Sequence, residues 1–370
     1  MKFLKYKRIY ILGLIPISLA LTLVAKQNKY FAEQIFALHI YKWISQIIST
    51  ISGIFPFSLA EILLYVFPIL IIFLVIRFFI KLIKYKVNRK VIFFKGVLNV
   101  FCFGSIMLFL FTVFAGLNYY RYPFSDYSNL EIAYSSVEEL YFLTESLALQ
   151  ANDLRDKTIK TDENNVFQLS TSMHDLGKMA VTAMELLSEE YPVLGGNYGS
   201  PKPILLSSVM SRTEITGIFI PFTMEANVNV DIPDYSIPAT MLHELAHLRG
   251  FMREDEANYI AYLAGMASDN PEISYSSTML ALVVSGNALY ERNKDLYFSI
   301  RDQYSEGVLI DIRANSAYWQ QYDDTVISAL SDKVNDTYLK ANAQIDGVQS
   351  YGRMLDLLLA KYRNDKLAAN

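Results

Sequence analysis

The chain has 370 residues, of which 52% are hydrophobic, and its mean hydropathy is +0.22. This composition excludes an ordinary soluble protein and predicts membrane segments. Residues 1–118 carry 14 Lys and Arg against two acids, whereas residues 119–370 carry 19 against 35, so the two net charges are +12 and −16. We therefore expect a basic membrane domain (1–118) followed by an acidic, water-soluble domain (119–370). The acidic domain excludes nucleic acid as a partner, because phosphate binding needs a basic surface.

Three apolar runs, at about residues 9–25, 59–80 and 96–117, are long enough to cross a bilayer as helices. The first run could instead be a signal peptide. No small-residue cleavage site follows it and more spans come after it, which favours an uncleaved anchor. The single cysteine, Cys102, lies in the third run, so an intramolecular disulfide is impossible.

Lysine and arginine predict the orientation of these spans. The N-terminal tail carries four of them and residues 77–95 carry seven, whereas the 33 residues of loop 26–58 carry three. Positively charged segments stay in the cytoplasm, so we expect residues 119–370 outside the cytoplasmic membrane. Within the loop, residues 31–50 are predicted to form an amphipathic helix at the outer membrane interface, with His39 as an interfacial side chain.

The water-soluble domain is predicted to begin with a tether over residues 118–134, followed by helices over 136–155 and 172–190. Short apolar or alternating runs then predict strands. These runs are PKPILLSS (201–208), GIFIPF (217–222) and ANVNVDI (226–232). From Pro238 onward the pattern is helical to the end of the chain. Breaks in it are expected at Gly250, near Asn270 and Asn293, and around Gly307.

The segment TMLHELAHLRG, residues 240–250, carries two histidines four positions apart. On a helix, His243 and His247 share one face and could present two nitrogens to one ion, with Glu244 beside them. HExxH on a helix is the arrangement of zinc hydrolases, because it supplies two ligands and a general base for zinc-bound water. The alternative is a chance motif on a surface helix, which the scarcity of histidine, four in the chain, disfavours.

A catalytic zinc site needs a third protein ligand, and no histidine follows the motif. Carboxylates on a second helix, predicted over residues 253–265, are therefore the candidates. Glu254 and Glu256 lie about 160° apart around that helix, so only one of the two can face the zinc. We favour Glu254 and keep Glu256, or a remote or absent third ligand, as the alternatives.

The segment EDEAN, residues 254–258, resembles the ExxA(D/N) element of gluzincin-type metallopeptidases. The resemblance implies that Glu254 is the third zinc ligand and that Asn258 orients a ligating histidine. The whole chain also resembles an uncharacterised bacterial family of three-span membrane proteins with a HELAHxRG…EDEAN core. The shared segments are PFSLAEILL, GIFIPFTMEANVN and DGVQSYGRMLDLLL. Two features differ from the gluzincin pattern: His247 is only seven residues before Glu254, and Asn258 replaces the usual Asp.

Three further residues are candidates for oxyanion or substrate contact. Glu225 lies in the hairpin predicted before the histidine helix. A strand of that hairpin could pair with an extended substrate, or the segment could be a plain hairpin. Tyr351 and Arg353 lie beside glycines on a distant segment and could fold over the site. With 26 tyrosines in the chain, ordinary packing is the alternative for Tyr351.

These features predict a mostly α membrane protein with three N-terminal transmembrane helices and an α+β, zincin-like domain that contains a small sheet. We expect a membrane-anchored, zinc-dependent metallopeptidase that hydrolyses a peptide or amide bond outside the membrane. Its partners would be the lipid bilayer and a peptide or protein substrate. The alternative is a zinc-binding sensor or envelope-assembly protein without turnover. A structural zinc site, however, has no need for a base and closes its fourth position with protein.

Overall fold

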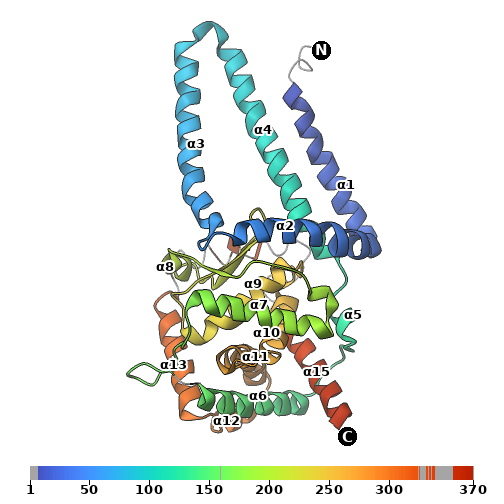
Figure 1. The fold of residues 1–370 in the computed structure, drawn as a ribbon, viewed down its shortest axis with the longest axis vertical. Helices are drawn as coiled ribbons and strands as arrows, with labels where there is room; N and C mark the ends of the chain where they lie inside the picture. Colours follow the sequence, from blue (N-terminus) through green and yellow to red (C-terminus); the bar gives the residue numbers. More distant parts are fainter. Residues whose placement is uncertain are drawn as a thin grey trace.

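Three long apolar helices stand on one side of a helical domain in this computed structural model (Figure 1). The structure describes residues 7–158, 160–323, 325, 331, 333–334, 336–337 and 353–369. Within them, three helices are long and apolar enough to cross a membrane, which confirms the three apolar helices predicted near the N-terminus. They are η2 (Lys7–Gly13) with α1 (Leu14–Gln27), α3 (Leu59–Lys84), and η4 (Lys86–Asn88) with α4 (Arg89–Phe114).

The ends of α3 follow from local signals in the sequence. Ser58 caps the helix, because its hydroxyl accepts the main-chain N–H of Glu61 at 3.0 Å. Lys81 and Lys84 occupy the last turn, where cations interact favourably with the helix dipole. Only 6% of the most apolar window of α3 is buried within the protein. Its outer surface therefore suits a lipid environment, in which a helix satisfies all of its main-chain groups internally.

A helical segment crosses the ends of the three apolar helices and separates them from the domain (Figure 1). This crossing helix consists of η3 (Phe31–Tyr41), a π-helix, and α2 (Lys42–Gly53). Its inner face holds the domain through polar contacts: Ser49 accepts the N–H of Gly199 at 2.9 Å. Trp43 is exposed on the opposite face. The helix predicted over residues 31–50 is thus present, three residues longer than expected.

Residues 118–134 do not form the expected tether, because their first part is packed at the junction of the crossing helix and the domain. The 3-10 helix η5 (Gly116–Tyr120) follows α4, and the short helix α5 (Ser125–Ser128) comes next. Phe124 is fully buried, with its ring centroid 5.3 Å from that of Phe251. The segment thus buries aromatic surface that a free linker would leave in water.

Helices make up most of the domain, and α11 packs against α6, α9 and α10 at its centre. The predicted starts after Ser136 and Ser172 are confirmed, because both serines cap helices. Asn270 and Asn293, where breaks were expected, cap α11 and α12. The helices are α6 (Val137–Lys157), α7 (Met173–Glu190), α8 (Ser207–Ser211), α9 (Ile237–Leu248), α10 (Glu254–Met266), α11 (Pro271–Arg292), α12 (Lys294–Arg301), α13 (Glu306–Gln320) and α15 (Met354–Ala369).

A small mixed sheet with the strand order β1-β3-β2 packs against α9. β1 (Lys202–Pro203) runs parallel to β3 (Glu225–Val228), and β2 (Gly217–Ile220) pairs antiparallel with β3 as the predicted hairpin. The strand predicted over residues 201–208 is wrong for most of its length. Glu61 accepts the next two main-chain N–H groups, those that follow Ile204, so the ladder ends and α8 begins. The fold is therefore mostly helical, with a sheet smaller than the sequence suggests.

One buried ion pair joins the crossing helix to the segment that leads into the domain. Arg121 donates to the two oxygens of Glu33, at 3.0 and 2.6 Å, and both side chains are almost completely buried. Burial alone would lower the pKa of Arg121, but the hydrogen bonds and charge of Glu33 outweigh it and raise that pKa. The guanidinium therefore stays charged inside the junction.

Removal of one partner of this pair should destabilise the protein, because it leaves an uncompensated buried charge. We expect Arg121→Met to lower the free energy of unfolding by about 3–5 kcal/mol. Thermal unfolding of the full chain in detergent micelles measures this. The double variant Arg121→Met with Glu33→Leu should recover part of the loss. Lys178→Met, which breaks an exposed pair, is the control and should change little. Equal stability of Arg121→Met and the wild type would contradict the prediction.

Candidate metal centre

The helix α9 presents two histidines on one face. Pro238 lies in its first turn, and the chain reverses after the helix at Gly250, whose φ of 89° lies in the left-handed region that favours glycine. His243 and His247 lie one turn apart, with ring centroids 4.6 Å from each other. After the reversal, α10 packs along α9. The motif therefore forms one wall of a site whose other wall is the next helix.

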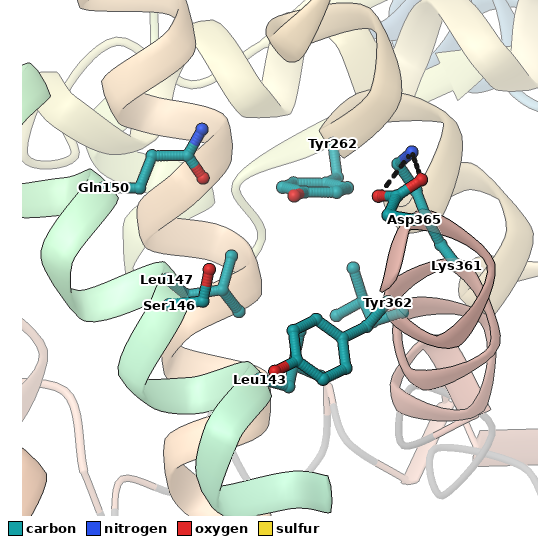
Figure 2. Close-up of a pocket in the computed structure, with 9 residues that line it drawn as sticks. Leu143, Ser146, Leu147, Gln150, Tyr262, Lys361, Tyr362 and Asp365 are labelled. Carbon is teal, nitrogen blue, oxygen red and sulfur yellow. Dashed lines mark hydrogen bonds and ion pairs between the residues drawn. The ribbon is translucent and has the colours of Figure 1, made fainter. Parts of the chain in front are cut away.

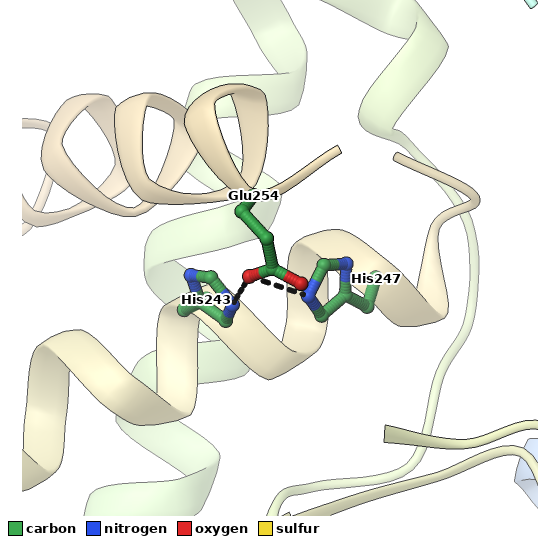
Figure 3. Close-up of side chains that lie close together, drawn as sticks. All are labelled: His243, His247 and Glu254. Atoms are coloured by element: carbon green, nitrogen blue, oxygen red, sulfur yellow. Dashed lines mark ion pairs between the residues drawn. The ribbon is translucent and has the colours of Figure 1, made fainter. Parts of the chain in front are cut away.

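Glu254, the first residue of α10, reaches both histidines (Figure 3). Its Oε2 lies 3.1 Å from Nε2 of His243 and 3.6 Å from Nε2 of His247. One ligand atom from each of the three residues lies within 4.8 Å of the others. Two imidazole nitrogens and one carboxylate oxygen make a donor set that Zn²⁺ accepts. We call these three residues the metal cluster.

Glu256 points away from the metal cluster. Its carboxylate accepts the main-chain N–H of Phe124 at 3.1 Å and pairs with Arg253 at 2.7 Å. Burial raises the pKa of Glu256, although Arg253 opposes that effect. Of the two carboxylates that the sequence left open, only Glu254 lies beside the histidines. Glu256 instead anchors the segment that follows α4.

An oxygen atom contacts the second ring nitrogen of each histidine. Nδ1 of His243 lies 2.7 Å from Oδ1 of Asn258, and Nδ1 of His247 lies 2.7 Å from the carbonyl oxygen of Phe251. A carbonyl oxygen can only accept, so each Nδ1 carries a proton, and Nε2 has a lone pair for a cation once the ring is neutral. The sequence resemblance pointed to Asn258. It missed the Phe251 carbonyl, because a main-chain oxygen leaves no residue-type signal.

The charges in the metal cluster are coupled. Burial would lower the pKa of His247, but the carboxylates of Glu254 and Glu244 raise it to about 9. Burial would raise the pKa of Glu254, but the two histidines hold it well below its usual range. The carboxylate thus stays anionic, and a cation that binds here has to displace a proton from His247.

Glu244 lies beside the metal cluster and is buried. Its Oε2 has no hydrogen-bond partner in the part of the chain that the structure describes. Burial raises the pKa of Glu244 to about 6, against the opposing effect of His243 and His247. The main-chain N–H of Phe219 in β2 donates to the same carboxylate. A carboxyl group with this pKa can take up and release a proton near neutral pH.

β2 approaches Glu244 so closely that only glycine fits at position 217. A Cβ atom on Gly217 would lie 2.5 Å from Oε1 of Glu244 and 2.7 Å from Cγ2 of Thr240. The strand and α9 therefore enclose the carboxylate between them. Sequence reasoning missed this contact, because the glycine lies in a predicted strand that is distant in sequence from the motif.

The end of α9 is held from the crossing helix. The hydroxyl of Tyr41 lies 3.4 and 3.2 Å from the carbonyl oxygens of His247 and Leu248. Arg121 donates to the carbonyl oxygen of Arg249 at 3.3 Å. These contacts satisfy carbonyl groups that the end of a helix leaves without intrahelical partners. Neither Tyr41 nor Arg121 carries a signal in the sequence that links it to the site.

Neither of the two further candidates that the structure describes, Glu225 and Arg353, lies in the metal cluster. Glu225 accepts the main-chain N–H groups of the first two residues of α3, at 3.0 and 2.8 Å. It therefore caps a helix, where an anion is stabilised, instead of facing the histidines. Arg353 pairs with Asp255 at 3.2 Å. Tyr351 lies outside the described residues.

A separate cavity of about 360 Å³ lies between α6, α10 and α15 (Figure 2). Gln150, Tyr262 and Tyr362 are among the residues that line it, and none of the metal cluster does. Tyr262 follows Glu254 by eight positions on α10, which places it about 12 Å further along the helix. The cavity and the metal cluster are therefore distinct features of the domain.

A family model described as a protein of unknown function, DUF3810, matches residues 36–359. The chain belongs to this family. The match begins in the crossing helix and ends in α15, so it contains α3, α4 and the metal cluster. No curated protein and no solved structure matches the chain. The family carries no assigned activity, so a functional conclusion has to come from the geometry of the site.

We expect Gly217→Ala to displace β2 from Glu244, because the added Cβ has no room. Overpacking of this kind costs about 1–3 kcal/mol, which thermal unfolding of the full chain in detergent micelles would show. Gly13→Ala is the matched control, because a Cβ there meets nothing within 4 Å. If both variants unfolded at the wild-type temperature, the close approach of β2 to Glu244 would be refuted.

Proposed function

We propose that this chain is a membrane-anchored, zinc-dependent metallopeptidase in which His243, His247 and Glu254 hold the metal. One observation carries the proposal. Nε2 atoms from one turn of α9 and a carboxylate from the start of α10 come within 4.8 Å of one another. Glu244, a buried carboxyl group with an oxygen that lacks a described partner, lies beside them.

The residues fit a catalytic zinc ion. Nδ1 of each histidine is hydrogen-bonded to an oxygen of the protein, at 2.7 Å in both cases. This arrangement leaves Nε2 for the metal. Three protein ligands leave a coordination position open, as catalytic zinc sites require and structural ones avoid. Bound zinc would supply a Lewis acid for a carbonyl substrate and lower the pKa of water.

Glu244 is suited to the proton transfers of peptide hydrolysis. Its carboxylate would take a proton from the water that adds to the peptide carbonyl carbon. It would then give that proton to the nitrogen as the C–N bond breaks, so one water is consumed and an acid and an amine form. The burial of Glu244 beside the metal cluster and its free Oε2 support both steps. The N–H of Phe219 orients the carboxylate.

The outer edge of β2 could bind an extended peptide. β2 is an edge strand of the sheet. The carbonyl of Thr216 accepts the N–H of Asn229 on the β3 side. Antiparallel pairing alternates, so Gly217 directs both of its main-chain groups, and Phe219 its carbonyl, away from β3, while the N–H of Phe219 is bound to Glu244. A substrate strand could add to this edge in the manner of β-augmentation.

We place the domain outside the cytoplasmic membrane. α3 and α4 are joined at the end far from the domain (Figure 1). That connection carries four basic residues, Lys84, Lys86, Arg89 and Lys90. Basic connections of this kind stay in the cytoplasm, which supports an extracytoplasmic position for residues 119–370.

Loss of the carboxylate of Glu254 should remove the metal. We expect a single zinc ion in the wild-type chain and little in Glu254→Ala, because catalytic zinc needs three protein ligands. Elemental analysis of the full chain in detergent micelles after dialysis measures this. Glu256→Gln is the matched control and should keep its zinc. Zinc loss in the control alone would indicate that Glu256, and not Glu254, is the third ligand.

Glu244→Gln should keep zinc but lose peptide hydrolysis. We expect cleavage of a synthetic peptide library to fall about 10²- to 10⁴-fold, because the general base is gone. Mass spectrometry of the products gives the rate, and elemental analysis gives the zinc content. Glu189→Gln, at an exposed position of α7, should behave as the wild type. A zinc-loaded wild type no faster than Glu244→Gln would rule out the peptidase and favour a zinc-binding sensor or assembly protein.

A further inference from the structure

The sheet separates α9 from the start of α3. Glu225 of β3 accepts the N–H groups of the first two residues of α3, and Lys202 of β1 pairs with the same carboxylate. Successive side chains of a strand point to opposite faces, so Ala226 faces away from α3. α9 packs against both β2 and β3. The sheet is thus a single layer between the histidine helix and a helix of membrane-crossing length.

Glu244 and the first residues of α3 lie on opposite sides of the sheet, one packed layer apart. Ala226 pairs with Phe219 across the hairpin, and the N–H of Phe219 donates to Glu244. The preceding residue of β3, Glu225, holds the start of α3. A strand residue spans about 3.3 Å and packed layers lie about 10 Å apart. The reactive part of the site is therefore on the order of 10 Å from the level at which α3 begins.

Buried contacts hold the domain against the first turn of α3 and against the crossing helix. Glu61, in the first turn of α3, accepts the N–H groups of Leu205 and Leu206 at 2.9 and 3.0 Å. Tyr41 of the crossing helix donates to the carbonyl of Leu248 at the end of the histidine helix. Movement of the domain away from the apolar helices would break these contacts and leave buried polar groups without partners.

Exposed apolar side chains occur on the part of the domain that is attached to α3. Leu205, the residue most exposed among them, is 81% accessible and is itself bound to Glu61 through its main chain. Exposed apolar side chains that gather on one part of a domain mark a protein or membrane interaction site. A bilayer surface is the occupant that fits, because Leu205 and Leu206 are bound through their main chain to the first turn of α3, whose outer surface is apolar. The apolar rim consists of Leu205, Leu206 and Val209 around α8, with Ile218 and Phe222 on the hairpin.

We infer that the proposed peptidase acts on membrane-anchored polypeptides and cuts the segment that emerges from the bilayer beside α3. The inference rests on the proposed function and names its substrate class. An extended chain covers about 3.3–3.6 Å per residue, so about three residues span the distance from the bilayer to the site and a few more occupy the site itself. We therefore expect cleavage within about ten residues of the bilayer surface. An anchored substrate also gains effective concentration over a free one.

The first test measures whether the apolar rim enters the bilayer, without use of activity. The full chain with Cys102→Ser is reconstituted in liposomes and carries a nitroxide at Leu205→Cys or Val209→Cys. The control is Leu149→Cys, an exposed position on α6 at the far side of the domain. At the rim positions, we expect the nitroxide to collide more often with oxygen than with a polar nickel complex. At the control position, we expect the reverse. Water-like accessibility at both rim positions would overturn the inference.

The second test measures where the zinc-loaded chain cuts. The probe is a single-span reporter polypeptide, in the same liposomes, that carries a long unstructured segment on the side of the domain. The same segment without its span is the soluble comparison. We expect cuts within about ten residues of the bilayer, and at least about tenfold slower cleavage of the soluble form. Glu244→Gln controls for contaminating proteases.

The outcomes separate the inference from the function on which it rests. Cuts spread evenly along the reporter, or equal rates for the anchored and the soluble segment, would overturn the inference and leave the peptidase in place. If a zinc-loaded chain cleaved neither form, the proposed function would fail and the substrate class with it. Cuts confined to the membrane-proximal residues, together with buried rim labels, would establish both.

Discussion

The buried contact between Glu33 and Arg121 is the interaction on which the rest of the structure depends. The guanidinium of Arg121 also donates to the carbonyl of Arg249 and lies 4.0 Å from the ring centroid of Phe251. It thereby holds the turn between α9 and α10, and the carbonyl of Phe251 in that turn contacts His247. The crossing helix at the base of the apolar helices and the metal cluster thus belong to one packed unit.

The few acids of the basic N-terminal part are buried where that part meets the acidic domain. Glu33 and Glu61 are the two acids of residues 1–118, and both are buried where that part meets the domain. Glu33 meets Arg121, Glu61 meets main-chain N–H groups, and Glu225 of the domain caps α3 in return. A buried carboxylate is costly unless it is fully hydrogen-bonded. Each of these groups therefore favours one docking geometry over the alternatives.

Local signals in the sequence predicted much of this protein. The apolar helices follow from length and hydropathy, and Ser136 and Ser172 cap helices at the expected positions. His243 and His247 share a face because helical spacing alone places them there. Features that depend on contacts across the fold were not predictable. Residues 118–134 read as a linker because their aromatic side chains have no helical or strand period. The burial of Phe124 among them depends on Tyr191, directly after α7, and on Tyr259 of α10.

The sequence by itself determined most of the helices and the residue types of the site, because helix periodicity, capping and motif spacing act over a few residues. It determined that two imidazoles lie one turn apart and that a helix with acidic residues in its first turn follows. Only the tertiary structure decided that Glu254 meets the histidines while Glu256 turns to Phe124. It also decided that Glu225 holds α3. These choices depend on which groups are buried together, and the free energy of a buried charge is set by neighbours that are distant in sequence.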